Sequence, residues 1–202
     1  MDLNDTAVHR GLRLACVSSA YAHIWNRHAP GLSSLGWSSD DARLTLDGPA
    51  QAEKTWCRAS ALRTEFARRM ALVEIDVLVA QAFGLDLDQL IEIYRVYFPV
   101  LQENEAGTWY DQQGRIIWTC SKGLPGVGYL IDGKSPGRKA WEKIAIEAPA
   151  ELTCDAIDDT QPGGPRKITR RFIGPFTQHD RVADYRRAWA HFERLKADGA
   201  AA

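Results

Sequence analysis

The sequence shows no long hydrophobic run, no signal-peptide pattern in its first residues and almost no net charge, and each of these features argues against a class of protein. No stretch of about 18 consecutive apolar residues occurs, so the sequence predicts no membrane-spanning helix and no membrane partner. The acidic start Met1–Asp5 is followed by no apolar segment of the signal-peptide type, which predicts a cytoplasmic location. The formal net charge of −1 excludes a strongly basic chain that binds nucleic acid through its overall charge.

Motifs for disulfide formation, catalysis and metal binding are also missing. The cysteines are widely spaced and form no CxxC pair, so we expect isolated reduced thiols at Cys16, Cys57, Cys120 and Cys154. The histidines are scattered, and neither GxSxG nor HExxH occurs. Asp158 and Asp159 lie in a Pro/Gly-rich stretch, where aspartate usually serves the turn. The sequence therefore predicts no catalytic residue, no metal site and no cofactor, and a stand-alone enzyme is the least favoured interpretation.

Charge and secondary-structure patterns divide the chain near residue 106. Residues 1–106 carry a net charge of −4 and have helical periodicity, whereas residues 107–202 carry a net charge of +3 and contain the strand patterns. We therefore expect an α+β fold, in which a helical region (1–106) packs on a small β-rich region (107–202) that ends in a helix. Any anion-binding face should lie in the second region.

One long helix is expected to dominate the first region, from Pro49 to Phe83, after an earlier helix within Leu3–Trp25. Its apolar residues form two stripes: Phe66, Met70, Val73, Val77 and Ala80 in one, and Leu72, Ile75, Val79 and Phe83 in the other. Two stripes predict a helix that is covered on two sides. Gly84 is expected to cap its C-terminus.

A second helix is expected to begin directly after this glycine. Asp86 and Gln89 match a capping box, and Pro99 should kink the helix or end its regular part. Its apolar stripe comprises Leu90, Ile93, Tyr94, Tyr97 and Leu101. The two helices should pack as a hairpin, and we interpret their stripes as core. The alternative is that the Phe66–Leu101 helix pair docks another protein.

The second region begins with a predicted β-hairpin and a glycine-rich run. Thr108–Tyr110 and Arg115–Thr119 are strand-like, and Gly114 can supply the positive φ that the turn between them needs. The run Gly123–Gly128 follows at once. It matches neither GxxxxGK[ST] nor GxGxxG, and no helix opens directly behind it, so a tight turn is favoured over a phosphate-binding loop.

The densest basic patch in the chain is the predicted strand Arg166–Phe176. Elsewhere we expect a short helix at Arg138–Lys143, a strand at Glu151–Asp155 and a closing helix at Asp180–Lys196. The candidates for holding a DNA phosphate backbone are Arg166, Lys167, Arg170, Arg171 and Lys122. The alternative is a solvated edge strand, whose charges prevent aggregation.

Aromatic side chains are weaker candidates for contacts with DNA bases. Trp109, Tyr110 and Arg115 of the hairpin are candidates for reading base edges or DNA shape. Trp118 and Trp141 would also stack on bases if they lay outside the core.

Several segments resemble a known family. IDVLVAQAFGL (Ile75–Leu85) and LIEI (Leu90–Ile93) resemble a helix pair of large bacterial DNA adenine methyltransferases of the type IIG kind and their phage-defence (BREX-like) relatives. The segments IYRVYFPVLQENEAGTWYDQQGRIIWTCSKGLPGVG, DDTQPGGP and DRVADYRRAWAHFE are similar to the C-terminal end of such enzymes. The resemblance covers about Leu62 to Glu193.

The resemblance implies an accessory role without methyl transfer. The chain lacks the family's S-adenosylmethionine-binding loop and its [N/D/S]-P-P-[Y/F] adenine site. The resemblance therefore implies a non-catalytic DNA-interacting or accessory module of a restriction-modification or phage-defence system, with DNA and possibly a methyltransferase or other defence-system subunit as partners. The rival interpretation is a protein-docking subunit that uses the helix pair without contacting DNA.

Overall fold

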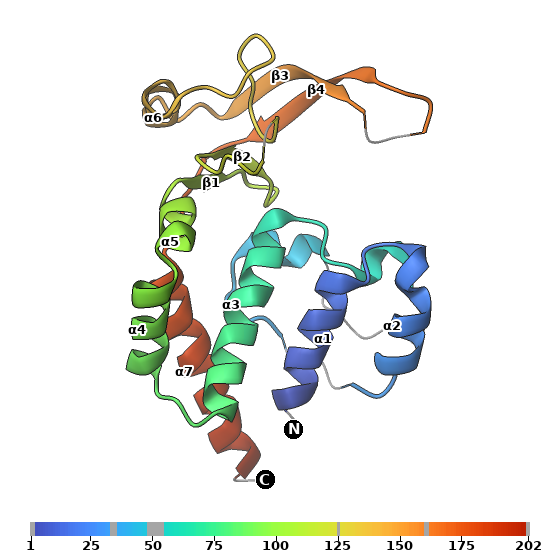
Figure 1. The fold of residues 1–202 in the computed structure, drawn as a ribbon, viewed down its shortest axis with the longest axis vertical. Helices are drawn as coiled ribbons and strands as arrows, with labels where there is room; N and C mark the ends of the chain where they lie inside the picture. The colour runs from blue at the N-terminus through green and yellow to red at the C-terminus, as the bar shows by residue number, and fades with distance from the viewer. Residues whose placement is uncertain (1–2, 33–35, 48–54, 125, 160–161, 201–202) are drawn as a thin grey trace. The chain divides into compact units, whose positions relative to one another are not determined.

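The computed structural model describes residues 3–32, 36–47, 55–124, 126–159 and 162–200, and their fold is α+β (Figure 1). Helices fill the first half, two small antiparallel sheets lie in the C-terminal half, and a helix closes the chain, as the sequence predicted. The chain divides into two compact units, one formed by residues 1–99 with 180–202 and the other by residues 100–179. This division differs from the expected one mainly because the terminal helix belongs to the first unit.

The first unit is built from helices. They are α1 (Leu3–Ala15), α2 (Ala22–His28), α3 (Glu65–Ala82), α4 (Leu87–Tyr97) and α7 (Arg181–Ala200), with 3-10 turns η1 (Ser19–Tyr21), η2 (Ala42–Asp47) and η3 (Arg58–Ser60). The helix α3 packs against both α1 and α7. It is therefore the central element of this unit.

The start of α3 corrects the prediction of a helix from Pro49. The helix begins at Glu65, where the Thr64 hydroxyl accepts the N–H of Ala67 at 3.3 Å. The described residues before it form η3 and extended chain instead, whereas 49–54 lie outside the described residues. A threonine cap fixes the helix start because its oxygen satisfies an N–H that has no partner inside the helix.

The junction between α3 and α4 confirms the predicted helical hairpin. Gly84 adopts a φ of +72°, and its N–H donates to the carbonyl of Gln81 at 3.1 Å. Asp86 and Gln89 then form the capping box, with hydrogen bonds of 2.8 and 2.9 Å. α4 ends before Pro99, where α5 begins.

Polar contacts attach the terminal helix α7 to α3. Arg69 and Asp184 form a buried ion pair at 2.7 Å. The carboxylate of Asp76 accepts hydrogen bonds from Arg181 at 2.9 Å and from the Tyr185 hydroxyl at 2.7 Å. These contacts join residues more than 100 positions apart, which explains why sequence patterns alone assigned α7 to the other region.

Only one of the two apolar stripes of α3 is covered. The predicted core stripe is buried: Phe66, Met70, Val73, Val77 and Ala80. In the second stripe, Leu72, Val79 and Phe83 are exposed. α3 is covered on two sides, by α1 and α7, but the prediction that these three residues belong to the core is wrong, and they become a candidate for binding.

α5 (Pro99–Ala106) leads into the second unit. The further elements of that unit are β1 (Thr108–Tyr110), β2 (Ile116–Thr119), α6 (Arg138–Ile146), β3 (Glu151–Asp158) and β4 (Arg166–Ile173). β1 and β2 pair antiparallel, as predicted, and β3 and β4 form a second antiparallel pair. The β3–β4 pair is hereafter called the ribbon.

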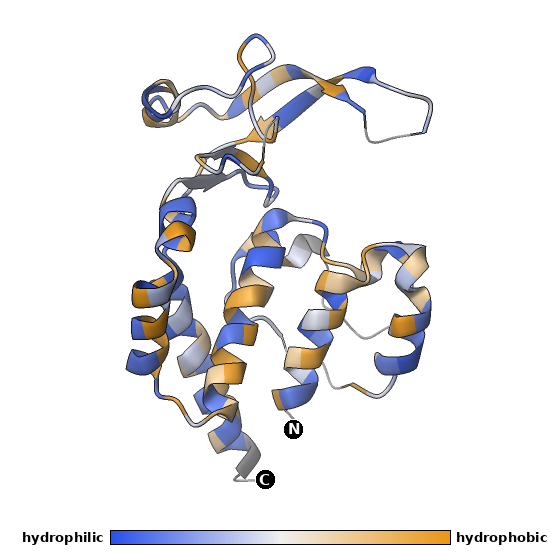
Figure 2. Cartoon of the chain, viewed as in Figure 1, coloured by the Kyte–Doolittle hydropathy of each residue, from blue (hydrophilic) through white to orange (hydrophobic). Residues whose placement is uncertain are grey.

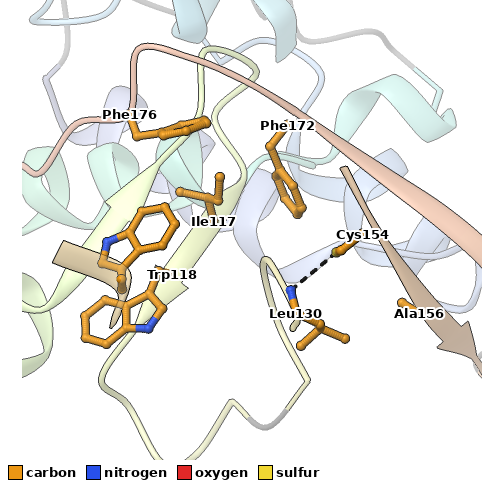
Figure 3. Packing of buried hydrophobic residues seen from close by; sticks show 8 residues of the cluster. Ile117, Trp118, Leu130, Cys154, Ala156, Phe172 and Phe176 are labelled. Atoms are coloured by element: carbon orange, nitrogen blue, oxygen red, sulfur yellow. Dashed lines mark hydrogen bonds between the residues drawn. The ribbon is translucent and has the colours of Figure 1, made fainter. Parts of the chain in front are cut away.

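A small apolar core joins the two sheets to α6 (Figure 3). It comprises Ile117, Trp118, Leu130, Trp141, Cys154, Ala156, Phe172 and Phe176. Trp118 and Trp141 stack with ring centroids 6.2 Å apart, and the indole N–H of Trp118 donates to the carbonyl of Pro136 at 2.8 Å. The N–H of Leu130 donates to the Cys154 sulfur at 3.3 Å, which holds the segment after the glycine-rich run against the ribbon.

Candidate functional site

The register of the ribbon divides the predicted DNA-contacting residues between its two faces. Cys154 lies opposite Arg170, and Asp158 lies opposite Arg166, on the face that carries the core residue Phe172. Lys167 alternates with these residues and therefore projects from the other face, as does Arg171. The four basic side chains of β4 thus do not form one continuous patch.

Carboxylates on β3 pair with two of these arginines. Arg166 and Asp158 form an ion pair at 2.9 Å, and Arg171 and Glu151 form another at 2.5 Å. The Glu151 carboxylate raises the pKa of the Arg171 guanidinium above its ordinary value. Both arginines stay exposed, so each retains access to solvent but shares its charge with an acidic neighbour.

Arg170 is bound to the glycine-rich run. Its Nη1 donates to the carbonyl of Gly126 at 2.6 Å and to that of Gly128 at 3.2 Å. Gly128 has a φ of +86°, and a Cβ at this position would lie 2.2 Å from the carbonyl oxygen of Ile117. Gly126 and Gly128 thus direct their carbonyl oxygens at a cation, which is the opposite of a phosphate-binding loop.

Arg115 is held by the turn of the first hairpin. Its Nε and Nη2 donate to the buried carboxylate of Asp111 at 3.0 and 2.6 Å. The other Asp111 oxygen accepts the N–H groups of Gln113 and Arg115, each at 2.9 Å. Nη2 also donates to the carbonyl of Arg171. Arg115 therefore links the hairpin turn to β4.

The aromatic candidates lie mostly in the interior. Tyr110 is 6% exposed, and Trp118 and Trp141 are also buried. Trp109 is half-buried, with its ring 6.0 Å from that of Trp141. Tyr110 is therefore not a candidate for contacting DNA, and the stacking proposed for Trp118 and Trp141 is excluded because their rings form the core.

Among the basic residues predicted to contact DNA, two lysines make no ion pair within the part of the chain that the structure describes. Lys122 and Lys167 are exposed, and neither makes an ion pair or hydrogen bond with the residues that the structure describes. The second unit, residues 100–179, contains equal numbers of basic and acidic residues. The positive balance expected for an anion-binding region therefore disappears when charge is counted by structural unit.

Several exposed apolar side chains of the first unit lie on α3, at its C-terminal cap and on α4. Leu72, Val79 and Phe83 are 46%, 43% and 80% exposed, and their spacing places them on one side of α3. On α4, Val96 and Tyr97 are also exposed. Figure 2 shows apolar residues recurring along both helices. Leu72, Val79 and Phe83 are hereafter called the α3–α4 face. The sequence pattern revealed the second apolar stripe of α3, which contains Leu72, Val79 and Phe83, but we interpreted this stripe as part of the hydrophobic core.

The interior of the first unit contains a charged cluster that the sequence did not indicate. Arg10 and Glu74 form a fully buried ion pair at 2.7 Å. The other Glu74 oxygen accepts the N–H of Ser38 at 2.7 Å. Beside Arg10, neither ring nitrogen of the buried His9 has a hydrogen-bond partner among the described residues. Burial, followed by the charges of Arg10 and Arg13, lowers the pKa of His9 to about 4.

Neither a metal-ligand cluster nor a helix able to span a membrane occurs in the described ranges. No group of three or more His, Cys, Asp or Glu side chains within them is arranged to hold a metal ion. Every helix that the structure describes is too short or too polar to cross a membrane.

Comparison with protein-family models, with curated proteins and with solved structures finds no match to the chain. The resemblance to DNA adenine methyltransferases therefore stays a hypothesis that rests on the quoted segments.

Proposed function

We propose that the chain is a non-catalytic accessory module that binds another protein through the α3–α4 face. The observation that carries the proposal is the exposure of Leu72, Val79 and Phe83 on the helix that organises the first unit. Exposed apolar residues that line up along one side of a helix are typical of interaction surfaces. Burying one such side chain contributes about 1.5–3 kcal/mol, so a few of them provide enough free energy to anchor a partner.

The nature of the partner follows from the sequence resemblance. Val79 and Phe83 lie within Ile75–Leu85, the segment that resembles the methyltransferase helix pair. We therefore propose a DNA adenine methyltransferase, or another subunit of a restriction-modification or phage-defence system, as the partner. A cytoplasmic location belongs to the same proposal.

Affinity capture from the native host tests this proposal. The double variant Leu72→Glu/Val79→Glu places two charges on the α3–α4 face without touching the buried stripe. Val17→Glu is the matched control, since Val17 is an exposed valine outside this face. We expect one protein to be retained by the wild type and by the control, and lost with the double variant. Equal retention by all three chains would contradict the proposal.

Direct DNA contact is the second candidate. The observation in its favour is that Lys122 and Lys167 are exposed and make no ion pair within the described residues, and that Lys167 shares one face of the ribbon with the exposed Arg171. Titration with duplex DNA at two salt concentrations tests it, because phosphate contacts weaken steeply as salt rises. Salt-sensitive binding that is lost in Arg166→Ala/Lys167→Ala would favour this candidate, and absence of binding at low salt would exclude it.

A further inference from the structure

The ribbon leaves a long strand edge without a neighbouring strand. β3 and β4 form a sheet of two strands, so each strand has one edge that faces away from the other (Figure 1). No strand among the described residues pairs with the outer edge of β3. Such an edge presents a row of backbone N–H and C=O groups with which another extended chain can pair.

The hydrogen bond at the end of the ribbon shows which backbone groups of β3 face outward. The N–H of Gly174 donates to the carbonyl of Ala150 at 2.8 Å, in register with the pairs of the ribbon. Hydrogen-bonded and non-hydrogen-bonded pairs alternate along an antiparallel ladder, so the even-numbered residues of β3 bond to β4. The backbone groups of the odd-numbered residues therefore point away from β4. The three central ones, hereafter called the outward residues, are Thr153, Asp155 and Ile157.

The outer edge of β4 is already partly covered, whereas that of β3 is open. The carbonyl of Ile173 accepts the N–H of Gln112 at 2.9 Å, and the carbonyl of Arg171 accepts the guanidinium of Arg115. The backbone groups of the outward residues make no hydrogen bond on their edge with the residues that the structure describes. The side chains of all three are exposed. β3 is therefore the strand with room for a further strand beside it.

The charge of β3 indicates which kind of chain fits this edge. Its sequence, ELTCDAID, contains acidic residues but no lysine or arginine. Glu151 and Asp158 pair with arginines of β4, whereas the exposed Asp155 makes no ion pair with the described residues. Like charges that face each other destabilise a pair of strands, and opposite charges stabilise it. A second copy of β3 is therefore a poor neighbour, and a strand with a basic residue is a good one.

We propose that the outer edge of β3 binds an extended segment of a partner protein as a third strand, with a lysine or arginine of that segment beside Asp155. Backbone hydrogen bonds to the outward residues provide the affinity, as they do when other peptides add to a sheet edge. The ion pair with Asp155 provides the selectivity for a basic segment. This edge belongs to the second unit and is separate from the α3–α4 face, so either proposal can fail without the other.

Nuclear magnetic resonance titration of the isotope-labelled full chain tests the inference. The probes are two nine-residue peptides of alternating threonine and valine, blocked at both ends, with lysine or glutamate as the central residue. We expect saturable shifts at the N–H groups of the outward residues, and about two- to fivefold tighter binding of the lysine peptide. Asp155→Lys should reverse this order. A reversal cannot come from unfolding, because the variant still binds the glutamate peptide.

A pair of proline variants tests the role of the backbone. Thr153→Pro removes an outward N–H of β3 without removing a hydrogen bond to β4, and Lys167→Pro does the same on the outer edge of β4. We expect Thr153→Pro to weaken binding of the lysine peptide roughly threefold or more, and Lys167→Pro to leave it unchanged.

Four results would overturn the inference. The first is the absence of saturable shifts at the outward residues of the wild type. The second is equal affinity of both peptides for the wild type and for Asp155→Lys. The third is equal weakening by the two proline variants. The fourth is a dimer that forms without peptide and is lost in Thr153→Pro, since the edge would then bind a second copy of the chain.

Discussion

Acidification from about pH 7 to about pH 5 should weaken the first unit through His9. The folded chain buries this imidazole completely, without a hydrogen-bond partner among the described residues and beside two arginines, so its pKa falls to about 4. The unfolded chain returns the imidazole to water, where its pKa is about 6.5. Between these two values the unfolded state binds more protons, and the free energy of unfolding therefore falls as the pH falls.

The magnitude follows from the same two pKa values. The shift of His9 from 6.5 to about 4 corresponds to a total loss of about 3 kcal/mol once the pH is below both values. Between about pH 7 and about pH 5 the expected loss is about 2 kcal/mol. Burial also lowers the pKa of His191, which adds a contribution of the same sign in the wild type.

Urea unfolding followed by circular dichroism at both pH values measures this effect. The variant His9→Leu keeps an apolar side chain beside Trp25 and removes the titrating group. Its free energy of unfolding should depend on pH by about 2 kcal/mol less than that of the wild type. His23→Leu, which removes an exposed histidine, is the matched control. If His9→Leu and the wild type lose the same free energy on acidification, the reasoning about His9 is refuted.

Two further predictions concern the second unit. Gly128→Ala should lower the free energy of unfolding by at least about 2 kcal/mol, because at this positive φ the new Cβ would overlap the carbonyl oxygen of Ile117. Gly133 also has a positive φ but open space around it, so Gly133→Ala should lower the free energy of unfolding by only about 1 kcal/mol. Thermal unfolding compares these two variants. Asp111→Ala should lower the free energy of unfolding by about 3 kcal/mol, because it removes a buried carboxylate that binds Arg115 and two backbone N–H groups. Denaturant unfolding measures this loss, and a cost below about 1 kcal/mol would contradict the role assigned to the carboxylate.

Local signals in the sequence predicted the elements that depend on neighbouring residues. The capping box of Asp86 and Gln89, the glycine cap at Gly84 and the break at Pro99 all involve groups within a few positions of one another. The turn of the first hairpin, with Gly114 at a φ of +75°, is of the same kind. Such features are fixed by short-range hydrogen bonds and by backbone sterics.

Long-range contacts decided the features that the sequence did not reveal. The pairing of β3 with β4 sets which basic side chains share a face and places Asp158 beside Arg166. The ion pair of Arg69 with Asp184 attaches α7 to α3. Periodicity shows that a helix has an apolar side, but not whether another element covers it, which is why the stripe containing Phe83 was interpreted as core.

Site-specific photo-crosslinking in the native host tests the central claim most directly. A photoreactive amino acid is placed at Phe83 on the α3–α4 face, at Lys167 on the ribbon, and at Arg27 on α2 as an exposed control. The account predicts one discrete protein adduct from Phe83, and neither that adduct from Arg27 nor a DNA adduct from Lys167. A DNA adduct from Lys167 without a protein adduct from Phe83 would contradict it.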